Sequence, residues 1–450
     1  MGTLLIEPIA LLATMDAEGR ELRDAAVLIR DGVIEAVGPR GTLGQADSVV
    51  DASRRLVMPG MVNTHHHLFQ SLTRATPGAQ DVALFGWLTT HYPIWQHITP
   101  AMITSSARLA LAELLLSGAT TVADHLYLYP NGVRIDDEIE AAQELGVRFC
   151  PTRGSMSMGA SRGGLPPDQV VEDEDAILRE TRRAIEAWHD PAPHSMCQIA
   201  VAPCAPFNVS EDLMVESAKL ARSYGVRLHT HVAETLDEER YTLERVGLKP
   251  VAYMASLGWM GPDVWWTHAV KLDADEIALM AETQTGVAHC PASNMRLGSG
   301  IAPVRAYLDA GVPVGLSVDG SASNDAGHML AEARLAMLLQ RVEHGAGALS
   351  AREALRMATA GGARVLGRSD IGQVAPGKAA DLIAYDLDRH ELAGAQADPL
   401  AALLFCAPVS VDWSLIAGRF VVRDGALVGH DLGRIVAEHN QASRQLMAHA

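Results

Sequence analysis

The middle of the chain, from about residue 61 to residue 366, alternates short apolar runs with amphipathic stretches of helical period. Eight of the apolar runs have the length of a buried strand, and they lie at 61–65, 119–124, 147–151, 196–202, 226–231, 264–268, 286–289 and 312–318. Helical patterns lie between most of these runs and after the last one, at 100–116, 135–145, 173–188, 211–224, 273–283 and 328–342. Eight strands that alternate with helices favour a closed (β/α)8 barrel, or TIM barrel, over an open sheet.

Both ends of the chain have a different pattern, which is typical of β-hairpins. Near the N-terminus, apolar residues on either side of Asp31-Gly32 predict two strands joined by a type I′ turn. The same arrangement recurs near the C-terminus around Asp424-Gly425. We therefore expect both termini to form one small composite β-sandwich domain, from residues 1–60 and 367–450, beside a barrel of residues 61–366.

Composition narrows the classes of function. The 450 residues carry a formal net charge of −18 at pH 7, which argues against binding to a nucleic-acid backbone. No apolar run reaches the roughly 18 residues that a membrane helix needs. The five cysteines are scattered without a CxxC spacing, which is typical of a reducing compartment. We expect a cytoplasmic protein with a small-molecule partner and with no nucleic-acid or membrane partner.

Side chains that can bind a metal gather where the predicted strands end, which is the functional face of such barrels. His65 and His67 end the first strand, and residues two apart on a strand share one face. Lone strand-end histidines such as His229 and His289 are more often structural. A set drawn from distant segments instead indicates a common site. The further candidates are His231 and Glu234 at the fifth strand, His268 at the sixth and Asp319 at the eighth.

Three imidazoles and one carboxylate suit one divalent metal ion, for which Zn²⁺ is expected and Fe²⁺ is the alternative. A second metal bridged by a carboxylated lysine is not expected, because no lysine precedes Lys219. The metal would lower the pKa of a bound water, and Asp319 would carry the proton of this water to the leaving group. Glu234 would protonate a ring nitrogen of the substrate, and His268 would orient the attacking oxygen.

Several sequence phrases together resemble the amidohydrolase superfamily, and within it the mononuclear-metal deaminases related to guanine deaminase and the s-triazine hydrolases. These phrases are PGMVNTHHH at 59–67, HVAE at 231–234, HCPASN at 289–294, SVDG at 317–320 and GKAADL at 377–382. Three more phrases resemble the 8-oxoguanine deaminase branch: LFQSLTR at 68–74, HLYLYPN at 125–131 and RGSMS at 153–157.

The resemblance implies a fold, a set of site residues and an activity. It implies metal ligands His65, His67, His231 and Asp319, catalytic residues Glu234 and His268, and a homo-oligomer. The implied reaction is the hydrolytic deamination of an amino-oxo purine, from 8-oxoguanine to urate and ammonia. The alternatives on the same scaffold are an s-triazine amino- or alkylaminohydrolase, an isocytosine or guanine deaminase, and a deaminase of a methylthioadenosine-type nucleoside.

Two alternatives come from other classes. A non-catalytic interaction protein is not expected, because every polar group that the chemistry needs is present. A deaminase of the cytidine type requires Pro-Cys-x-x-Cys. Here Pro203-Cys204 begins that phrase, but Phe207 occupies the position of its second cysteine.

Residues that follow the first three strands are candidates for binding the substrate. We predict this role for Gln70, Tyr127, Arg153 and Ser155, which offer donors and acceptors to a purine edge. Trp87 and Trp95 could stack on a flat ring, although large aromatic residues more often serve packing. The stretch 153–168 is rich in Gly, Ser, Met and Pro, and is predicted to be a long loop that could close the site.

Overall fold

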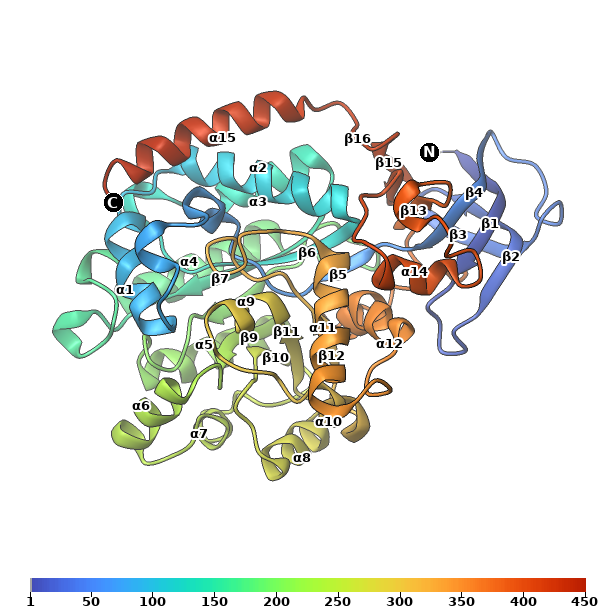
Figure 1. The fold of residues 1–450 in the computed structure, drawn as a ribbon. Coiled ribbons are helices and arrows are strands. Elements are labelled where there is room, and N and C mark those ends of the chain that lie inside the picture. The colour runs from blue at the N-terminus through green and yellow to red at the C-terminus, as the bar shows by residue number, and fades with distance from the viewer. Residues whose placement is uncertain (1) are drawn as a thin grey trace.

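A closed barrel of eight parallel strands forms the centre of the protein in the computed structural model, which describes residues 2–450 (Figure 1). Consecutive strands lie side by side around the barrel, and β12 pairs with β5 to close it. The strands are β5 (Met61–Asn63), β6 (Ala119–Leu126), β7 (Arg148–Ser155), β8 (Ala200–Pro203), β9 (Arg227–Val232), β10 (Val264–His268), β11 (Gly286–His289) and β12 (Val314–Leu316). The predicted barrel is confirmed, and each of its predicted strands overlaps an observed one.

Helices surround the barrel (Figure 1). They are α1 (Leu84–Trp95), α2 (Pro100–Ser117), α3 (Asp136–Leu145), α4 (Glu174–Trp188), α5 (Glu211–Tyr224), α6 (Leu236–Val246), α7 (Pro250–Ser256), α8 (Ala274–Thr283), α9 (Pro291–Arg296), α10 (Val304–Ala310), α11 (Met329–His344), α12 (Ala351–Arg356) and α13 (Gly362–Val365). The six predicted helices correspond to α2, α3, α4, α5, α8 and α11.

Local sequence determines where three of these helices begin. Thr99, Asp173 and Ser210 each accept a hydrogen bond from a backbone N–H in the first turn.

The two ends of the chain build a second sheet of eight strands, in the order β16-β15-β14-β13-β4-β1-β2-β3. These strands are β1 (Thr3–Ala13), β2 (Glu21–Arg30), β3 (Val33–Pro39), β4 (Ser48–Pro59), β13 (Leu382–Asp386), β14 (Trp413–Ile416), β15 (Arg419–Arg423) and β16 (Ala426–Leu427). Both predicted hairpins are confirmed. Their turns at Asp31-Gly32 and Asp424-Gly425 have positive φ at both residues, as a type I′ turn requires.

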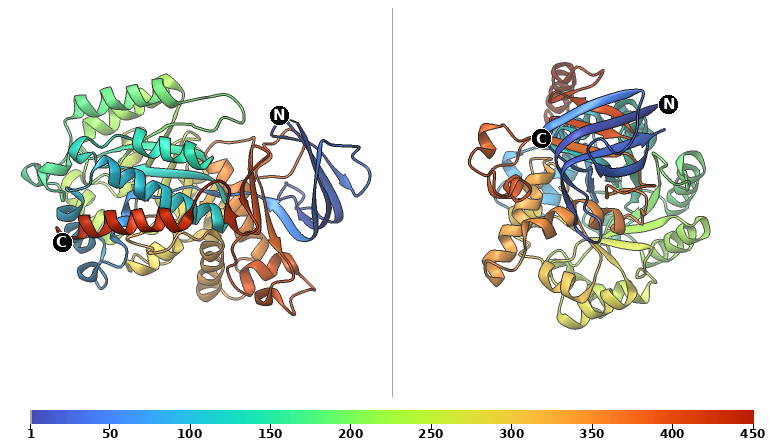
Figure 2. Two further views of the ribbon diagram at one scale, coloured as in Figure 1. Left: turned by 90° about the horizontal axis from the view of Figure 1, so that it is seen from above. Right: turned by 90° about the vertical axis from the view of Figure 1, so that its right-hand side faces the viewer.

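The last helix returns from this sheet to the barrel. In Figures 1 and 2, α15 (Leu432–Met447) runs along the outside of the barrel beside α2. It also contacts η1 (Leu68–Thr73), the helical turn that comes after His65 and His67: His439 Nε2 donates to the carbonyl of Ser71 at 3.0 Å. We propose residues 60/61 and 366/367 as the division between the two domains, with α15 as a segment that crosses back over it.

A buried ion pair joins the barrel to the terminal sheet. Arg148 at the start of β7 donates to both carboxylate oxygens of Asp381, at 2.7 and 2.9 Å, and both side chains are almost completely buried. The same guanidinium donates to the carbonyls of His194 and Ser195. Asp381 Oδ1 also accepts the backbone N–H of Ala417. The pair therefore fixes where the sheet attaches, and neither charge has water as an alternative partner.

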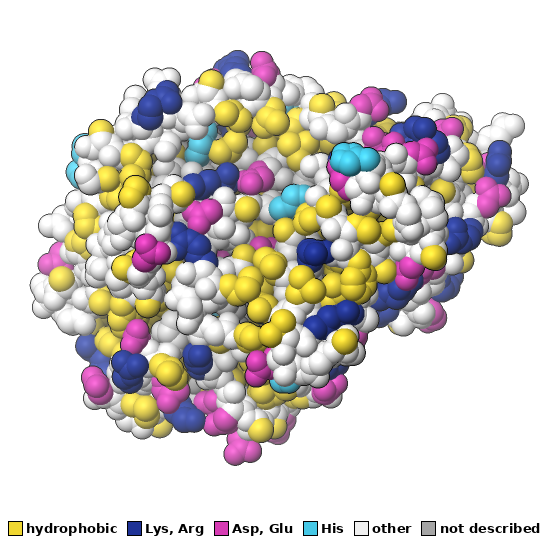
Figure 3. All heavy atoms as spheres, in the orientation of Figure 1, with side chains coloured by type: hydrophobic (Ala, Val, Ile, Leu, Met, Phe, Trp, Pro, Cys, Tyr) yellow, Lys and Arg dark blue, Asp and Glu magenta, His cyan; other side chains and the backbone are white. Residues whose placement is uncertain are grey.

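Ion pairs on the surface differ from this buried ion pair in their exposure to water. On the face shown in Figure 3, acidic and basic side chains lie interspersed among apolar ones. Ion pairs such as Arg54 with Asp388, 3.2 Å apart, have both side chains more than half exposed. No helix within residues 2–450 has the length and the apolar character needed to span a bilayer.

We predict that Asp381→Asn lowers the free energy of unfolding by about 3–5 kcal/mol, because it leaves the Arg148 guanidinium buried without its counter-charge. Asp388→Asn is the matched control, and the loss of an exposed pair should cost at most about 1 kcal/mol. Chemical unfolding of the two variants and the parent protein measures both changes. Equal effects of the two substitutions would contradict the structural role of the buried pair.

Candidate metal centre and active site

Three imidazoles and one carboxylate converge at the carboxyl end of the barrel. His65 and His67 directly follow β5, His231 lies near the end of β9, and Asp319 follows β12. His67 Nε2 lies 3.1 Å from His65 Nε2 and 3.2 Å from His231 Nε2. Asp319 Oδ1 lies 3.2 Å from His65 Nε2 and 3.5 Å from His67 Nε2. The structure thus brings together the four ligands predicted from the sequence.

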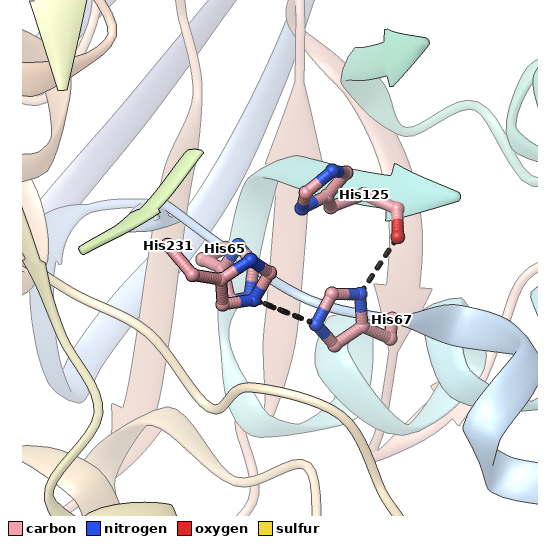
Figure 4. A group of neighbouring side chains, drawn as sticks. All are labelled: His65, His67, His125 and His231. Atoms are coloured by element: carbon pink, nitrogen blue, oxygen red, sulfur yellow. Dashed lines mark hydrogen bonds between the residues drawn. The ribbon is translucent and has the colours of Figure 1, made fainter. Parts of the chain in front are cut away.

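Two of the imidazoles are held from behind by backbone carbonyls. His67 Nδ1 donates to the carbonyl of His125 at 2.7 Å (Figure 4), and His231 Nδ1 donates to that of Cys204 at 2.6 Å. A neutral imidazole has a single N–H, so Nε2 carries a free lone pair in both rings. Burial lowers the pKa of His67 and lowers the pKa of His231 further, so both rings are neutral near pH 7.

The third imidazole is oriented by another histidine, His229. The Nδ1 of His229 donates to the carbonyl of Trp265 at 3.0 Å, so the Nε2 of His229 is an acceptor. That acceptor lies 2.7 Å from His65 Nδ1, which therefore carries the proton and leaves the lone pair on His65 Nε2. Burial lowers the pKa of His229 to about 3, so it stays neutral in this role. His229, one of the strand-end histidines whose ordinary role is structural, thus positions a predicted ligand.

The donor set fits a divalent metal ion. Lone pairs of neutral nitrogens about 3 Å apart repel one another unless a cation lies between them. Zn²⁺ binds nitrogen at about 2.0–2.1 Å, so nitrogen ligands of one ion would lie roughly 3 Å apart, close to the separations seen here. Each imidazole also makes a hydrogen bond through its other ring nitrogen, as metal-binding histidines typically do.

His125 lies close to this cluster at the end of β6, and its ring nitrogens are near enough to raise the question of a further ligand. Its Nε2 donates to the carbonyl of Ala202 at 2.8 Å. Its ring stacks on the ring of His231, with centroids 5.0 Å apart and planes inclined by 23°. Figure 4 shows that its carbonyl, and not its ring, reaches His67. We therefore assign His125 to the support of the predicted ligands.

A carboxyl group and an imidazole stand beside the cluster. His268 Nδ1 donates to Asn294 Oδ1 at 2.9 Å, so its Nε2 is free to accept a proton. This Nε2 lies 3.5 Å from Glu234 Oε2 and 3.8 Å from Asp319 Oδ2. Burial raises the pKa of Glu234, which favours its protonated form. Ser299 Oγ lies 3.2 Å from Glu234 Oε1. The two residues predicted to be catalytic therefore adjoin the predicted ligands.

The backbone at these strand ends is strained. Ala233, His268 and Asp319 have φ values of 54°, 72° and 61°, in the left-handed region that side chains other than glycine rarely adopt. Such residues cost on the order of 1–3 kcal/mol each, and they cluster at functional sites. The fold accepts this cost where it turns side chains toward one point.

A small cavity, with about 40 Å³ of free internal volume, opens beside the cluster. Its polar lining includes two of the predicted substrate-binding residues, Gln70 and Tyr127, which are linked by a hydrogen bond of 3.3 Å. Its apolar lining includes Leu84, Trp87, Leu88, Phe207 and Leu297. Trp95 is completely buried and does not line the cavity.

Arg153 and Ser155 do not line this cavity. The Arg153 guanidinium pairs with Glu172 at 2.8 Å and lies over the ring of Tyr129. Ser155 is the last residue of β7, and its carbonyl accepts the backbone N–H of Cys204. The predicted loop at 153–168 accordingly begins inside β7, and its remainder includes a 3₁₀ turn at Ala160–Arg162. Neither residue is therefore placed to contact a substrate in this cavity.

Sequence patterns did not single out several residues of the cavity. Asn208 and Phe207 lie between β8 and α5, and Leu84 and Tyr92 lie on α1, a helix that was not predicted. The signal for α1 is weak because apolar residues occur all around it and Pro93 interrupts it. Only the packing of loops over the barrel brings these side chains to the site.

Comparisons with known proteins identify the family of the chain. A sequence model of the amidohydrolase family matches residues 56–421. The chain is 47% identical to a Pseudomonas aeruginosa protein named 8-oxoguanine deaminase, over 97% of this chain and 98% of that one. It is also similar to the crystal structure of atrazine chlorohydrolase TrzN from Arthrobacter aurescens TC1 complexed with zinc, with a TM-score of 0.93, 36% identity, and coverage of 98% and 100% of the two chains. It is also similar to the structure of an adenosine deaminase from Xanthomonas campestris with bound zinc, with a TM-score of 0.91 and 30% identity. This match covers 99% of this chain and 98% of that one.

We predict that His231→Ala removes stoichiometric metal from the purified protein, because it deletes one of the three converging lone pairs. His344→Ala, which alters an exposed histidine at the end of α11, should retain as much metal as the parent protein. Elemental analysis after gel filtration measures both. Retention of a full complement of metal by His231→Ala would exclude His231 as a ligand.

We predict a smaller effect for His229→Ala, because His65 would remain present but lose the acceptor that fixes its proton on Nδ1. Metal affinity should fall by about 10–100-fold, the range for residues that orient a metal ligand. Competition with a chelator of known affinity measures the change. An affinity equal to that of the parent protein would reduce His229 to a packing residue.

Proposed function

The chain belongs to the amidohydrolase family, and we propose that it is a zinc-dependent deaminase that hydrolyses 8-oxoguanine to urate and ammonia. The observation that carries this proposal is the convergence of His65, His67, His231 and Asp319 beside a buried Glu234. The extent of the similarity to a protein named 8-oxoguanine deaminase supports the choice of substrate. Zinc is proposed because two similar structures contain it.

The predicted ligands hold the ion, which when bound lowers the pKa of a coordinated water toward neutrality. Asp319 has two distinct carboxylate oxygens for its part in the reaction. Oδ1 faces the imidazoles and accepts the backbone N–H of Gly320 at 2.7 Å. Oδ2 faces His268 and accepts the Ser323 hydroxyl at 3.3 Å. Oδ2 is therefore placed to accept the proton of the attacking water and to return it to the amine that leaves as ammonia.

Glu234 supplies the other proton. Burial raises the pKa of Glu234, which favours the protonated carboxyl group that would give its proton to the ring nitrogen beside the amino-bearing carbon. Protonation of this nitrogen makes the carbon more electrophilic. The carboxyl of Glu238 holds the backbone in place, since it accepts the N–H groups of Ala233 and Glu234, each at 2.9 Å. His268, fixed by Asn294, lies beside both Glu234 and Asp319 and orients the attacking oxygen.

The cavity supports a flat heterocycle as the substrate. Trp87 and Phe207 offer aromatic surfaces to a planar ring, and the leucines complete an apolar enclosure. Gln70 lines the cavity, and its Oε1 has no hydrogen-bond partner among residues 2–450. It can accept a ring N–H next to the reacting carbon. Tyr127, whose oxygen accepts from Gln70 Nε2, can donate to a neighbouring carbonyl oxygen.

We predict that the metal-loaded enzyme has its highest kcat/KM with 8-oxoguanine, in a panel that also includes guanine, isocytosine, hydroxyatrazine and methylthioadenosine. Steady-state release of ammonia, with urate identified as the second product, measures this order. A higher kcat/KM with any other member of the panel would replace 8-oxoguanine as the proposed substrate.

The inactive reference for this panel is Glu234→Gln, which keeps the shape of the side chain but cannot deliver a proton in the same way. It should retain metal, and its kcat should fall by about 10²-fold or more. Glu282→Gln, at an exposed position of α8, should have the kcat of the parent enzyme. An unchanged rate in Glu234→Gln would remove this residue from the mechanism.

A further inference from the structure

One polar side chain of the cavity has no role in the chemistry above. Asn208 lies between β8 and α5, is 1% exposed and lines the cavity. Its Oδ1 accepts the backbone N–H of Ala205 at 2.9 Å, and this bond fixes which way the amide points. Its Nδ2 has no hydrogen-bond partner within residues 2–450. A buried donor without a partner carries a free-energy cost that a bound ligand can relieve.

The segment that carries Asn208 is rigidly connected to the metal centre. The carbonyl of Asn208 accepts the N–H groups of Ser157 and Met158, each at 3.1 Å, which ties the segment to the end of β7. At its other end, the carbonyl of Cys204 accepts His231 Nδ1. The loop that orients a metal ligand therefore also fixes the free amide, so a substrate placed by the metal meets this donor in a defined position.

The surroundings of Asn208 favour a neutral acceptor. The Asn208 side chain lies close enough to the hydroxyl of Tyr92 and the thiol of Cys204 to lower the pKa of each, but neither group forms a hydrogen bond of regular geometry with Nδ2. Burial raises the pKa of Tyr92 well above its usual value and raises that of Cys204 to about 12. Both groups are therefore uncharged at neutral pH. A single amide N–H suits a carbonyl oxygen, which is a neutral acceptor.

The remaining groups of the cavity indicate which carbonyl this is. Gln70 is packed against Gly320, next to Asp319, while Glu234 stands near His268. These two side chains serve the ring nitrogens on either side of the reacting carbon. The hydroxyl of Tyr127, bonded to Gln70, serves the oxygen at C6, which neighbours one of these nitrogens. The oxygen at C8, on the other ring, is left without a donor unless Asn208 supplies it.

We propose that Asn208 is a specificity-determining residue whose Nδ2 donates a hydrogen bond to the C8 oxygen of the purine, an inference that rests on the proposed function. Guanine has no oxygen at C8 and would leave the amide unpaired. A site built to bond a polar group of its substrate rejects an analogue that lacks this group. Asn208 thus separates an oxidised purine from its ordinary parent base.

Two variants test this role. Asn208→Ala removes the donor together with the bond to Ala205. Asn208→Asp keeps an oxygen that can accept the Ala205 N–H, but it replaces the donor by an acceptor that repels a carbonyl oxygen. Each variant is compared with the parent enzyme for metal content, thermal unfolding and kcat/KM with 8-oxoguanine. Guanine is measured in parallel as a substrate or, if turnover is too slow, as a competitive inhibitor of 8-oxoguanine turnover.

In both variants, kcat/KM for 8-oxoguanine should fall by roughly 10- to 100-fold more than the corresponding constant for guanine. An equal loss with both purines, or a loss in Asn208→Ala that Asn208→Asp restores, would show that Asn208 merely supports its loop and would overturn the proposal. So would unchanged kinetics in either variant. Failure of the proposed function is seen separately, because the parent enzyme itself would then not deaminate 8-oxoguanine, and the assignment of Asn208 to the C8 oxygen would fall with it.

Discussion

The mutual approach of three imidazole lone pairs is the constraint on which the rest of this structure depends. Each lone pair faces the others because the opposite nitrogen of its ring is committed to an acceptor: the carbonyl of His125, the carbonyl of Cys204, and the ring of His229. Without a cation, this arrangement brings like partial charges together in a buried place. The protein maintains it through the closed hydrogen-bonded barrel, since the acceptors belong to strands other than those of the ligands they hold. His67 follows β5 and relies on β6, and His231 on β9 relies on the residue after β8.

Closure of the barrel therefore matters to the chemistry as much as to stability. His65 follows β5 but donates a hydrogen bond to His229 of β9, so its orientation requires that the strands form a complete ring. The strained backbone at His268 and Asp319 is tolerated for the same reason, because neighbouring strands and Asn294 fix both side chains. The ion pair of Arg148 with Asp381 extends this dependence to the terminal sheet, since β7 carries one partner and the start of β13 is adjacent to the other.

The parts of the fold that could be predicted from the sequence are those with a local signal. A strand of the barrel is apolar over its whole length, and the Asp-Gly turns require a positive φ that few other residues adopt. The pair His65 and His67 could be assigned to one face because the period of a strand is two. Arg153 and Ser155 could not be placed in this way. Their positions at the end of β7 suggested that both side chains line the cavity. The Arg153 guanidinium instead pairs with Glu172, which is nineteen positions away in the chain, so no local pattern indicates this contact. Asn208 gave no signal at all, because its importance comes from the bond to Ala205 that directs its free donor.

This difference separates the two tasks of the site. Strand ends hold the proposed metal ligands and proton carriers, and their positions follow from hydrogen bonds that every strand of the barrel must make. The proposed substrate site is formed instead by α1, by the turn after His67 and by the segment before α5, which are connections between strands and helices. A change at Asn208 or Trp87 can therefore alter the ring that is accepted without disturbing the bonds that orient the imidazoles. It follows that relatives can share the ligand geometry and the fold while acting on different heterocycles, and that substrate assignments for such chains depend on the residues of these loops more than on the metal centre.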